Sequence, residues 1–91
     1  MDVTEELLAR LERLAARADP PPWRAMVEGR DHLSGASFIM IGATGDRRED
    51  MYVSRDSGPA DPATLDYVAE ACASVPALIA EVRRLRKSDK D

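Results

Sequence analysis

The chain has little of the chemistry that cysteine and histidine supply, since it contains one residue of each. A single cysteine excludes an internal disulfide, which is typical of proteins that stay in a reducing compartment. One histidine and one cysteine are too few for a zinc site built from nitrogen and sulfur ligands. We therefore expect no cofactor or metal that depends on these side chains.

Long apolar runs and aromatic residues are also scarce. No run of 18 apolar residues is present, and the chain does not begin with a charged-then-apolar leader, so we expect a cytoplasmic protein without a membrane partner. Aromatic residues make up only 4% of the 91 residues, so aliphatic side chains must supply most of the core. A domain of this size buries roughly 60 to 65% of its unfolded surface, and dimerisation would extend so modest a core.

Positive charge is not in surplus either. The chain has 13 Lys and Arg residues against 17 Asp and Glu residues, a formal net charge of −4. Binding to a phosphate backbone draws on an excess of Lys and Arg. The balance disfavours nucleic acid as the main partner.

The most periodic stretch is residues 61–87, which predicts a helix. Asp61 is placed to cap its first turn, and Pro62 occupies the first helical position, where a missing N–H is tolerated. We expect its apolar stripe to face the chain's own sheet along its whole length. The stripe has three- and four-residue spacing and consists of Leu65, Val68, Cys72, Val75, Ile79 and Val82.

Pro76 interrupts this helical pattern. A proline inside a helix removes a backbone hydrogen bond, which predicts a kink or a short break near residues 74–76. In the case of a break, Ser74 is placed to cap a second helical piece. Residues 88–91 are expected to form a frayed tail.

The first 19 residues predict an amphipathic helix over residues 3–18, with Leu7, Leu11, Leu14 and Ala18 on one stripe. Asp2 followed by Glu5 resembles a capping box. Residues 20–22 are prolines, which end the helix and predict a stiff connector. A rigid spacer is favoured over a proline-rich docking motif, because such motifs usually lie in disordered tails.

Residues 20–60 predict a small antiparallel sheet of two or three strands. Residues 37–43 are apolar on both faces, which is typical of a central strand. Residues 50–55 predict the next strand, joined to it through a polar loop at 44–49. Residues 23–28 alternate well enough to predict a third strand. The fold class is therefore α+β: a helix, a small antiparallel sheet and a second helix in one domain.

Three groups of residues are of types that often bind phosphate or metal ions, but a purely structural role explains each of them better. Residues 42–46 lack the Lys-Ser/Thr pair of a phosphate-binding loop and precede a strand, so they predict a hairpin turn. Asp31 and His32 predict a surface turn. The acidic residues near the loops lack calcium-loop spacing and alternate with arginines, which predicts a solvated rim. These acidic residues are Asp46, Glu49, Asp50, Asp56 and Asp61.

Cys72 and Trp23 are both expected in the core. Cys72 lies on the apolar stripe, and a buried thiol behaves as a small hydrophobic group unless its pKa is lowered. Trp23 is expected to pack between the sheet and the C-terminal helix.

The C-terminal helix carries two candidate interaction surfaces. Leu78 and Leu85 lie one heptad apart on a flank, next to Glu81 and Arg84, and this pattern predicts a homodimer. The basic end complements the helix dipole, or alternatively contacts an acidic partner or a nucleic-acid backbone. Its other basic residues are Arg83, Arg86, Lys87 and Lys90.

Several short motifs resemble a known family. Pro22-Trp23, Gly58-Pro59, Asp66-Tyr67-Val68-Ala69 and Val75-Pro76 together resemble the Ead-like family of small phage and prophage proteins, and related hypothetical proteins common in actinobacteria. Cys72 departs from the pattern, since the family often has a polar or basic residue there. The resemblance implies an accessory phage protein without an assigned activity, and it carries over no catalytic residue.

The sequence thus predicts a small non-enzymatic protein-interaction or regulatory protein of phage or prophage type that acts as a cytoplasmic homodimer. A host or phage protein is a further expected partner. The alternative is a nucleic-acid-associated accessory factor that uses the basic C-terminal end.

Overall fold

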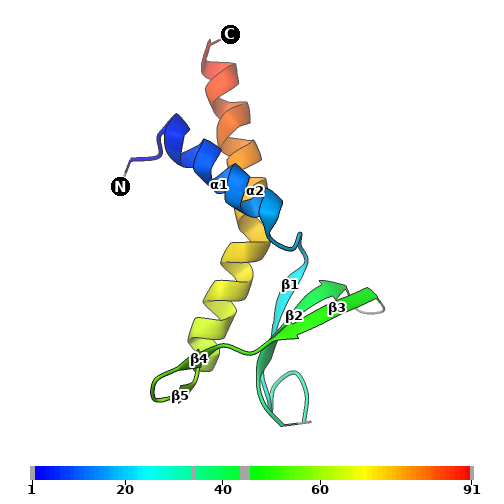
Figure 1. Ribbon diagram of the computed structural model, residues 1–91. Helices are drawn as coiled ribbons and strands as arrows, with labels where there is room; N and C mark the ends of the chain where they lie inside the picture. The colour runs from blue at the N-terminus through cyan, green and yellow to red at the C-terminus, as the bar shows by residue number, and fades with distance from the viewer. Residues whose placement is uncertain (1, 34, 44–45, 91) are drawn as a thin grey trace.

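A computed structural model describes residues 2–33, 35–43 and 46–90 of the chain. It confirms the α+β class: a helix, a small antiparallel sheet and a long second helix (Figure 1). The elements are α1 (Glu5–Arg17), β1 (Trp23–Met26), β2 (Phe38–Ala43), β3 (Asp46–Met51), β4 (Ser54–Arg55), β5 (Gly58–Pro59) and α2 (Pro62–Lys90).

Helix α1 begins at Glu5 because Thr4 caps it. The Thr4 hydroxyl accepts a hydrogen bond from the backbone N–H of Leu7 at 3.1 Å, which satisfies one of the unpaired donors of the first turn. The predicted capping box from Asp2 is therefore wrong, since the helix starts two residues later than that box requires. The buried residue of α1 is Leu8, on the side that packs against α2.

The proline connector is held against the sheet. The backbone N–H of Gly42 donates to the Pro22 carbonyl at 3.0 Å, and the Arg48 guanidinium donates to the Pro20 carbonyl at 2.6 Å. The peptide bond between Pro21 and Pro22 is cis. These hydrogen bonds support the rigid-spacer interpretation over a free docking motif.

The three main strands form an antiparallel sheet in the order β1-β2-β3. Strand β2 is central, as predicted, and its residues 38–42 are buried. Strand β1 confirms the third strand but ends at Met26. The next two backbone N–H groups donate to side chains instead of a strand, Val27 to the Asp31 carboxylate at 2.8 Å and Glu28 to the Ser37 hydroxyl at 3.0 Å.

Strand β3 corrects the predicted hairpin. Asp46 already pairs with Ala43, so most of the predicted loop at 44–49 is strand, and the strand predicted at 50–55 ends at Met51. The charged residues of β3 suit an edge strand, where one side of the backbone faces solvent and charge prevents unwanted pairing. A polar edge strand resembles a loop when only its composition is considered.

Gly42 gives the predicted turn at 42–46 a structural explanation. Its φ of 104° lies in the region that favours glycine, and the register between β2 and β3 shifts between Ile41 and Gly42. Thr44 and Gly45 lie outside the described residues. The described part of this motif therefore forms a β-bulge at the end of the hairpin.

The short β4–β5 hairpin leads into α2, which Asp61 caps as predicted. The Asp61 carboxylate accepts hydrogen bonds from the Thr64 N–H at 3.3 Å and the Thr64 hydroxyl at 2.7 Å. The Arg55 guanidinium lies 2.9 Å from the same carboxylate. The Thr64 hydroxyl is the main cause of a lowered pKa at Asp61. This carboxylate stays charged at the positive end of the helix dipole.

Helix α2 continues through Pro76 to Lys90, so the short break considered for residues 74–76 is wrong. The Ser74 hydroxyl donates to the Glu70 carboxylate at 3.2 Å instead of capping a new helix. The helix also includes residues 88–90, beyond its predicted end at Lys87. Both halves of α2 pack on other elements, and this packing stabilises the helix on either side of the proline.

The hydrophobic core lies between the sheet and the first half of α2. It is centred on Ile39 of β2 and Leu65 of α2, which are 0% and 1% exposed, with Ala25, Ala60 and Ala69 around them. The apolar pattern predicted between Leu65 and Val82 faces this core only in the first half of α2. Ile79, farther along, is buried where α1 packs on α2, so the expectation that it faces the sheet is wrong.

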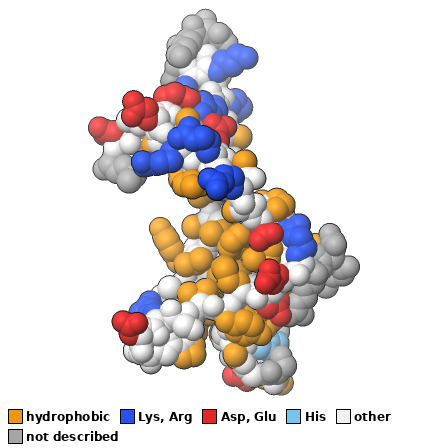
Figure 2. All heavy atoms as spheres, viewed as in Figure 1, with side chains coloured by type: hydrophobic (Ala, Val, Ile, Leu, Met, Phe, Trp, Pro, Cys, Tyr) orange, Lys and Arg blue, Asp and Glu red, His pale blue; other side chains and the backbone are white. Residues whose placement is uncertain are grey.

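The molecule is elongated. Its radius of gyration is 15.9 Å, whereas about 12 Å is typical of a compact domain of this length. The 29 residues of α2 span about 43 Å, and its second half extends past the sheet with α1 across one side (Figure 1). On the face shown in Figure 2, charged side chains gather over α1 and the end of α2, and hydrophobic ones gather below α1.

Candidate interaction surface

An exposed line of large apolar side chains runs along α2. Tyr67, Leu78 and Leu85 are 77%, 59% and 49% exposed. Their spacings of 11 and 7 residues are close to three and two whole turns of a 3.6-residue helix, so the three side chains share one face. We call these three residues the α2 stripe. The predicted uncovered flank at Leu78 and Leu85 is confirmed, and Tyr67, which was not predicted to lie on it, extends this flank toward the start of α2.

The α2 stripe lies on a different side of the helix from the packed residues. The buried residues Leu65, Ala69 and Ile79 contribute to contacts with the sheet or α1. At 100° per residue, Leu65 and Ile79 project more than 90° away from Leu78. Neither the sheet nor α1 therefore covers the stripe.

The two charged interface candidates pair with each other. The Arg84 guanidinium donates to both carboxylate oxygens of Glu81, with an Nε–Oε2 distance of 3.1 Å. These hydrogen bonds lower the pKa of Glu81 and raise that of Arg84. Glu81 lies three residues after Leu78 and four before Leu85, so it borders the α2 stripe directly, and Arg84 lies behind it.

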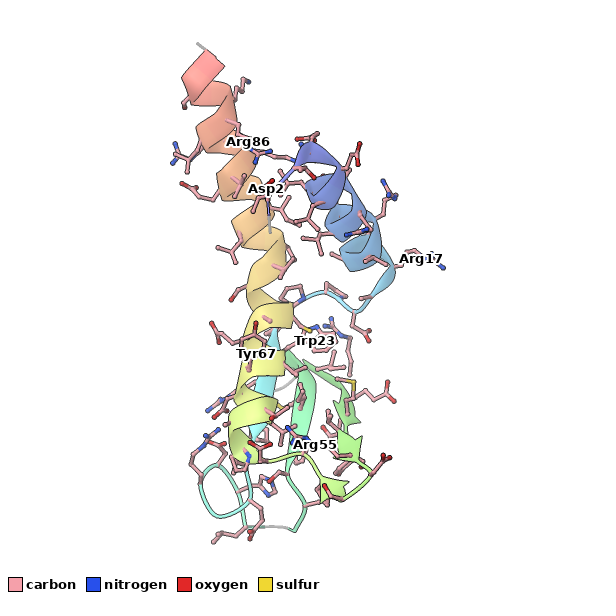
Figure 3. The ribbon with its side chains drawn as sticks, turned by 90° about the vertical axis from the view of Figure 1, so that its left-hand side faces the viewer. Asp2, Arg17, Trp23, Arg55, Tyr67 and Arg86 are labelled. Atoms are coloured by element: carbon pink, nitrogen blue, oxygen red, sulfur yellow. The ribbon has the colours of Figure 1, made fainter. Side chains whose placement is uncertain are left out.

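The predicted basic patch is divided by α1. The Arg83 guanidinium donates to the carboxylates of Glu5 and Glu12, and the Glu12 hydrogen bond is the main cause of its raised pKa. Arg86 reaches from α2 to the carbonyl of Val3, with Glu5 4.0 Å away (Figure 3). Two of the predicted contact residues therefore attach α1 to α2.

Lys87 is exposed, and the side chain of Lys90 lies outside the described residues. Since the Arg83 guanidinium is already paired with two carboxylates of α1, fewer cations are available to a phosphate backbone than the sequence indicated. This arrangement gives less support to the alternative of a nucleic-acid-associated factor.

A polar cleft of about 470 Å³ lies beside β1 and the first half of α2, but its charges neutralise one another. The Arg30 guanidinium donates to both oxygens of Asp66 at 2.9 Å and to Asp31 at 3.0 Å. The hydrogen bond from Arg30 is the main cause of the lowered pKa of both carboxyl groups. The cluster ties the turn after β1 to α2, a contact between distant residues that the sequence did not reveal.

His32 has a structural position in the same turn. Its ring lies 5.1 Å from the Phe38 ring, and its Nε2 atom lies 3.2 Å from the Met26 carbonyl oxygen. Among the described residues, no group of three or more His, Cys, Asp or Glu side chains is arranged to hold a metal ion. These contacts support the surface-turn interpretation of Asp31 and His32.

Cys72 is half-buried, so its predicted place in the core is wrong. It lines a mainly apolar groove of about 240 Å³ where α1, the connector and α2 meet. Trp23 lies in the same region (Figure 3), packs against the edge of the core, and donates its indole N–H to the Asp19 carbonyl at 3.0 Å. Cys72 is only half-buried because the sheet packs on α2 before this point and α1 packs on it after this point.

Helix α2 is also long and apolar enough to cross a membrane between Pro62 and Ser88, judged by length and composition alone, since one 18-residue window within it has a mean hydropathy of 1.2. Core helices pass the same test, so this is weak evidence for a membrane span. Only 17% of the apolar window is buried, which leaves much of it without cover.

Comparison with family models, curated proteins and solved structures found no match to this chain. The resemblance to the Ead-like family therefore stays a prediction.

Proposed function

We propose that this chain is a small non-enzymatic interaction protein that forms a homodimer through the α2 stripe. The observation that carries the proposal is the exposure of Tyr67, Leu78 and Leu85 on one face of a helix that extends past its own sheet. Exposed apolar patches on soluble proteins commonly mark interaction sites. A twofold dimer would cover this face with the same face of a second copy.

The expected affinity is moderate. Burying one leucine side chain contributes roughly 1.5 to 3 kcal/mol, and a symmetric dimer buries Leu78 and Leu85 from both copies. Association costs about 4 to 15 kcal/mol in lost translational and rotational freedom. With the largest gain and the smallest cost the balance is about 8 kcal/mol, so these leucines alone support a dissociation constant on the order of micromolar at the tightest.

The proposed role is regulatory and cytoplasmic. The predicted likeness to accessory phage and prophage proteins supports a role in binding other proteins, including a host or phage partner. The mutual neutralisation of Arg30, Asp31 and Asp66 also supports a role without catalysis, because charges committed to each other are poor general acids and bases.

Light scattering on a size-exclusion peak tests the proposed homodimer. At tens of micromolar we expect a mass of about 20 kDa, twice the 10.0 kDa of the chain, falling toward 10 kDa on dilution. A mass of one chain at every concentration would contradict the proposal.

A further inference from the structure

We propose that the two copies of α2 pair in parallel and in register, as a short two-stranded coiled coil. This inference rests on the proposed homodimer and adds its geometry. It names the residues that meet at the interface and the ion pairs that select this orientation.

The residues along the uncovered side of α2 fit a heptad seam. Val75, Leu78, Val82 and Leu85 have three-, four- and three-residue spacing, as the core positions of a coiled coil do. In this frame the valines occupy position a and the leucines position d. Branched residues at a with leucine at d favour parallel, two-stranded coiled coils.

The seam is open to a second helix. Leu78 and Leu85 are exposed, and Val75 and Val82 are half-buried toward the side where α1 packs. The a and d side chains would thus lie between two neighbours of α2, with α1 on one side and the partner helix on the other. A pair of chains in this arrangement forms a bundle in which both halves of each α2 are covered.

The charges beside the seam select the parallel orientation. In the same frame Glu81 is at position g and Arg86 at position e of the next heptad, five residues later. Residues at g and e of parallel helices form ion pairs across the seam. A parallel dimer therefore pairs Glu81 of each copy with Arg86 of the other, whereas antiparallel helices bring g positions to g positions and like charges together.

Both partners of this pair are available. Glu81 is exposed, and its carboxylate accepts hydrogen bonds from Arg84 of its own helix. Arg86 contacts the Val3 carbonyl, and its guanidinium has five N–H donors, so it can bind a carboxylate of the second copy as well. Its place at the edge between α1 and the seam suits this double contact.

Disulfide trapping distinguishes the two orientations. We would place single cysteines at Ala71 or Leu85, both at position d, in a chain that also carries Cys72→Ser. These positions are 14 residues, about 21 Å, apart along the helix. In a parallel in-register dimer each variant oxidises to a species of about 20 kDa on a non-reducing gel, twice the 10.0 kDa chain. An antiparallel dimer has one twofold axis across the helices, so it traps at most one of the two variants.

The matched control is Ala77→Cys in the same background. Ala77 is also exposed on α2 but lies at position c, away from the seam, and it should stay at 10 kDa under the same oxidation. Trapping of only one d-position variant, or equal trapping of the control, would overturn the parallel arrangement. If light scattering still gives two chains, the homodimer stands without it, and a monomer would remove both proposals.

A charge exchange tests the ion pair without touching the seam. In the proposed homodimer, residue 81 of each copy faces residue 86 of the other, so Glu81→Lys places two positive charges together and Arg86→Glu places two negative charges together. A heterodimer of the two variants has opposite charges at both of these contacts. We expect each variant alone to dissociate at a concentration at least tenfold higher than the wild type, and the mixture to recover the wild-type value. A mixture no tighter than either variant would contradict the assigned pair.

Discussion

Replacing Leu78 and Leu85 together by aspartate should dissociate the dimer and leave the monomer folded. Each leucine contributes roughly 1.5 to 3 kcal/mol when buried, and the change also places four carboxylates in an apolar seam. Since 1.4 kcal/mol corresponds to a factor of ten, we expect the dissociation constant to rise at least about 100-fold. The light-scattering mass should fall to the 10.0 kDa of one chain.

Leu33→Asp is the matched control for this variant. Leu33 is 85% exposed but lies in the turn before β2, far along the chain from the α2 stripe, so this change should leave the dimer intact. The double variant should keep the helical circular dichroism of the wild type. If it unfolds instead, Leu78 and Leu85 belong to the chain's own core and the proposed interface is wrong.

Leu65→Ala should destabilise the fold more than any change on the α2 stripe. Leu65 is 1% exposed and lies in the core cluster with Ile39 and Ala69. Truncation of a buried leucine to alanine costs about 2 to 5 kcal/mol, and a domain of this length has a total stability of roughly 5 to 14 kcal/mol. We expect a large fall in the urea midpoint of unfolding.

Leu33→Ala is the comparison for this measurement, because an exposed side chain usually changes stability by less than about 0.5 kcal/mol. A Leu65→Ala variant that unfolds at the wild-type midpoint would show that the core does not lie between the sheet and the first half of α2.

The α+β architecture was predictable because its strongest signals are local. Each of these signals depends only on residues close together in the chain, and each marks a real element: the apolar periodicity of residues 65–82, the Asp61 cap and the apolar strand at residues 37–43. The extent of β3 was not predictable from an alternation of apolar and polar residues. Most of its side chains are charged, as is common in an edge strand, whose outer backbone edge faces solvent. Asp2 and Thr4 are both favourable N-cap residues, so the sequence alone did not determine at which of them α1 begins.

The exposure of Leu78 and Leu85 was also predictable, since a heptad spacing on one helix is local. The division of the basic end was not, because the Arg83 contacts reach Glu5 and Glu12 more than 70 residues away. The Arg30–Asp66 pair joins residues 36 positions apart for the same reason. Contacts of this kind depend on where separate elements meet, which no single stretch of sequence encodes.

The misplacement of Cys72 and Ile79 has a geometric cause. A continuous apolar stripe indicates that one side of a helix is covered, but it does not say by how many neighbours. In this chain the sheet covers the first half of α2 and α1 covers the second, with a groove at Cys72 between them. The change of neighbour leaves the second half of α2 covered on one side only, and this is the origin of the free leucine face.

The leucine methyl resonances of the wild-type protein on dilution test the α2 interface most directly. We expect the methyl signals of Leu78 and Leu85 to shift together across the dissociation range, because a partner chain covers them only in the dimer. Leu65 in the core and Leu33 in the exposed turn should keep their positions and serve as internal controls. Signals of Leu78 and Leu85 that stay fixed while other leucines shift would place the interface elsewhere and contradict the account.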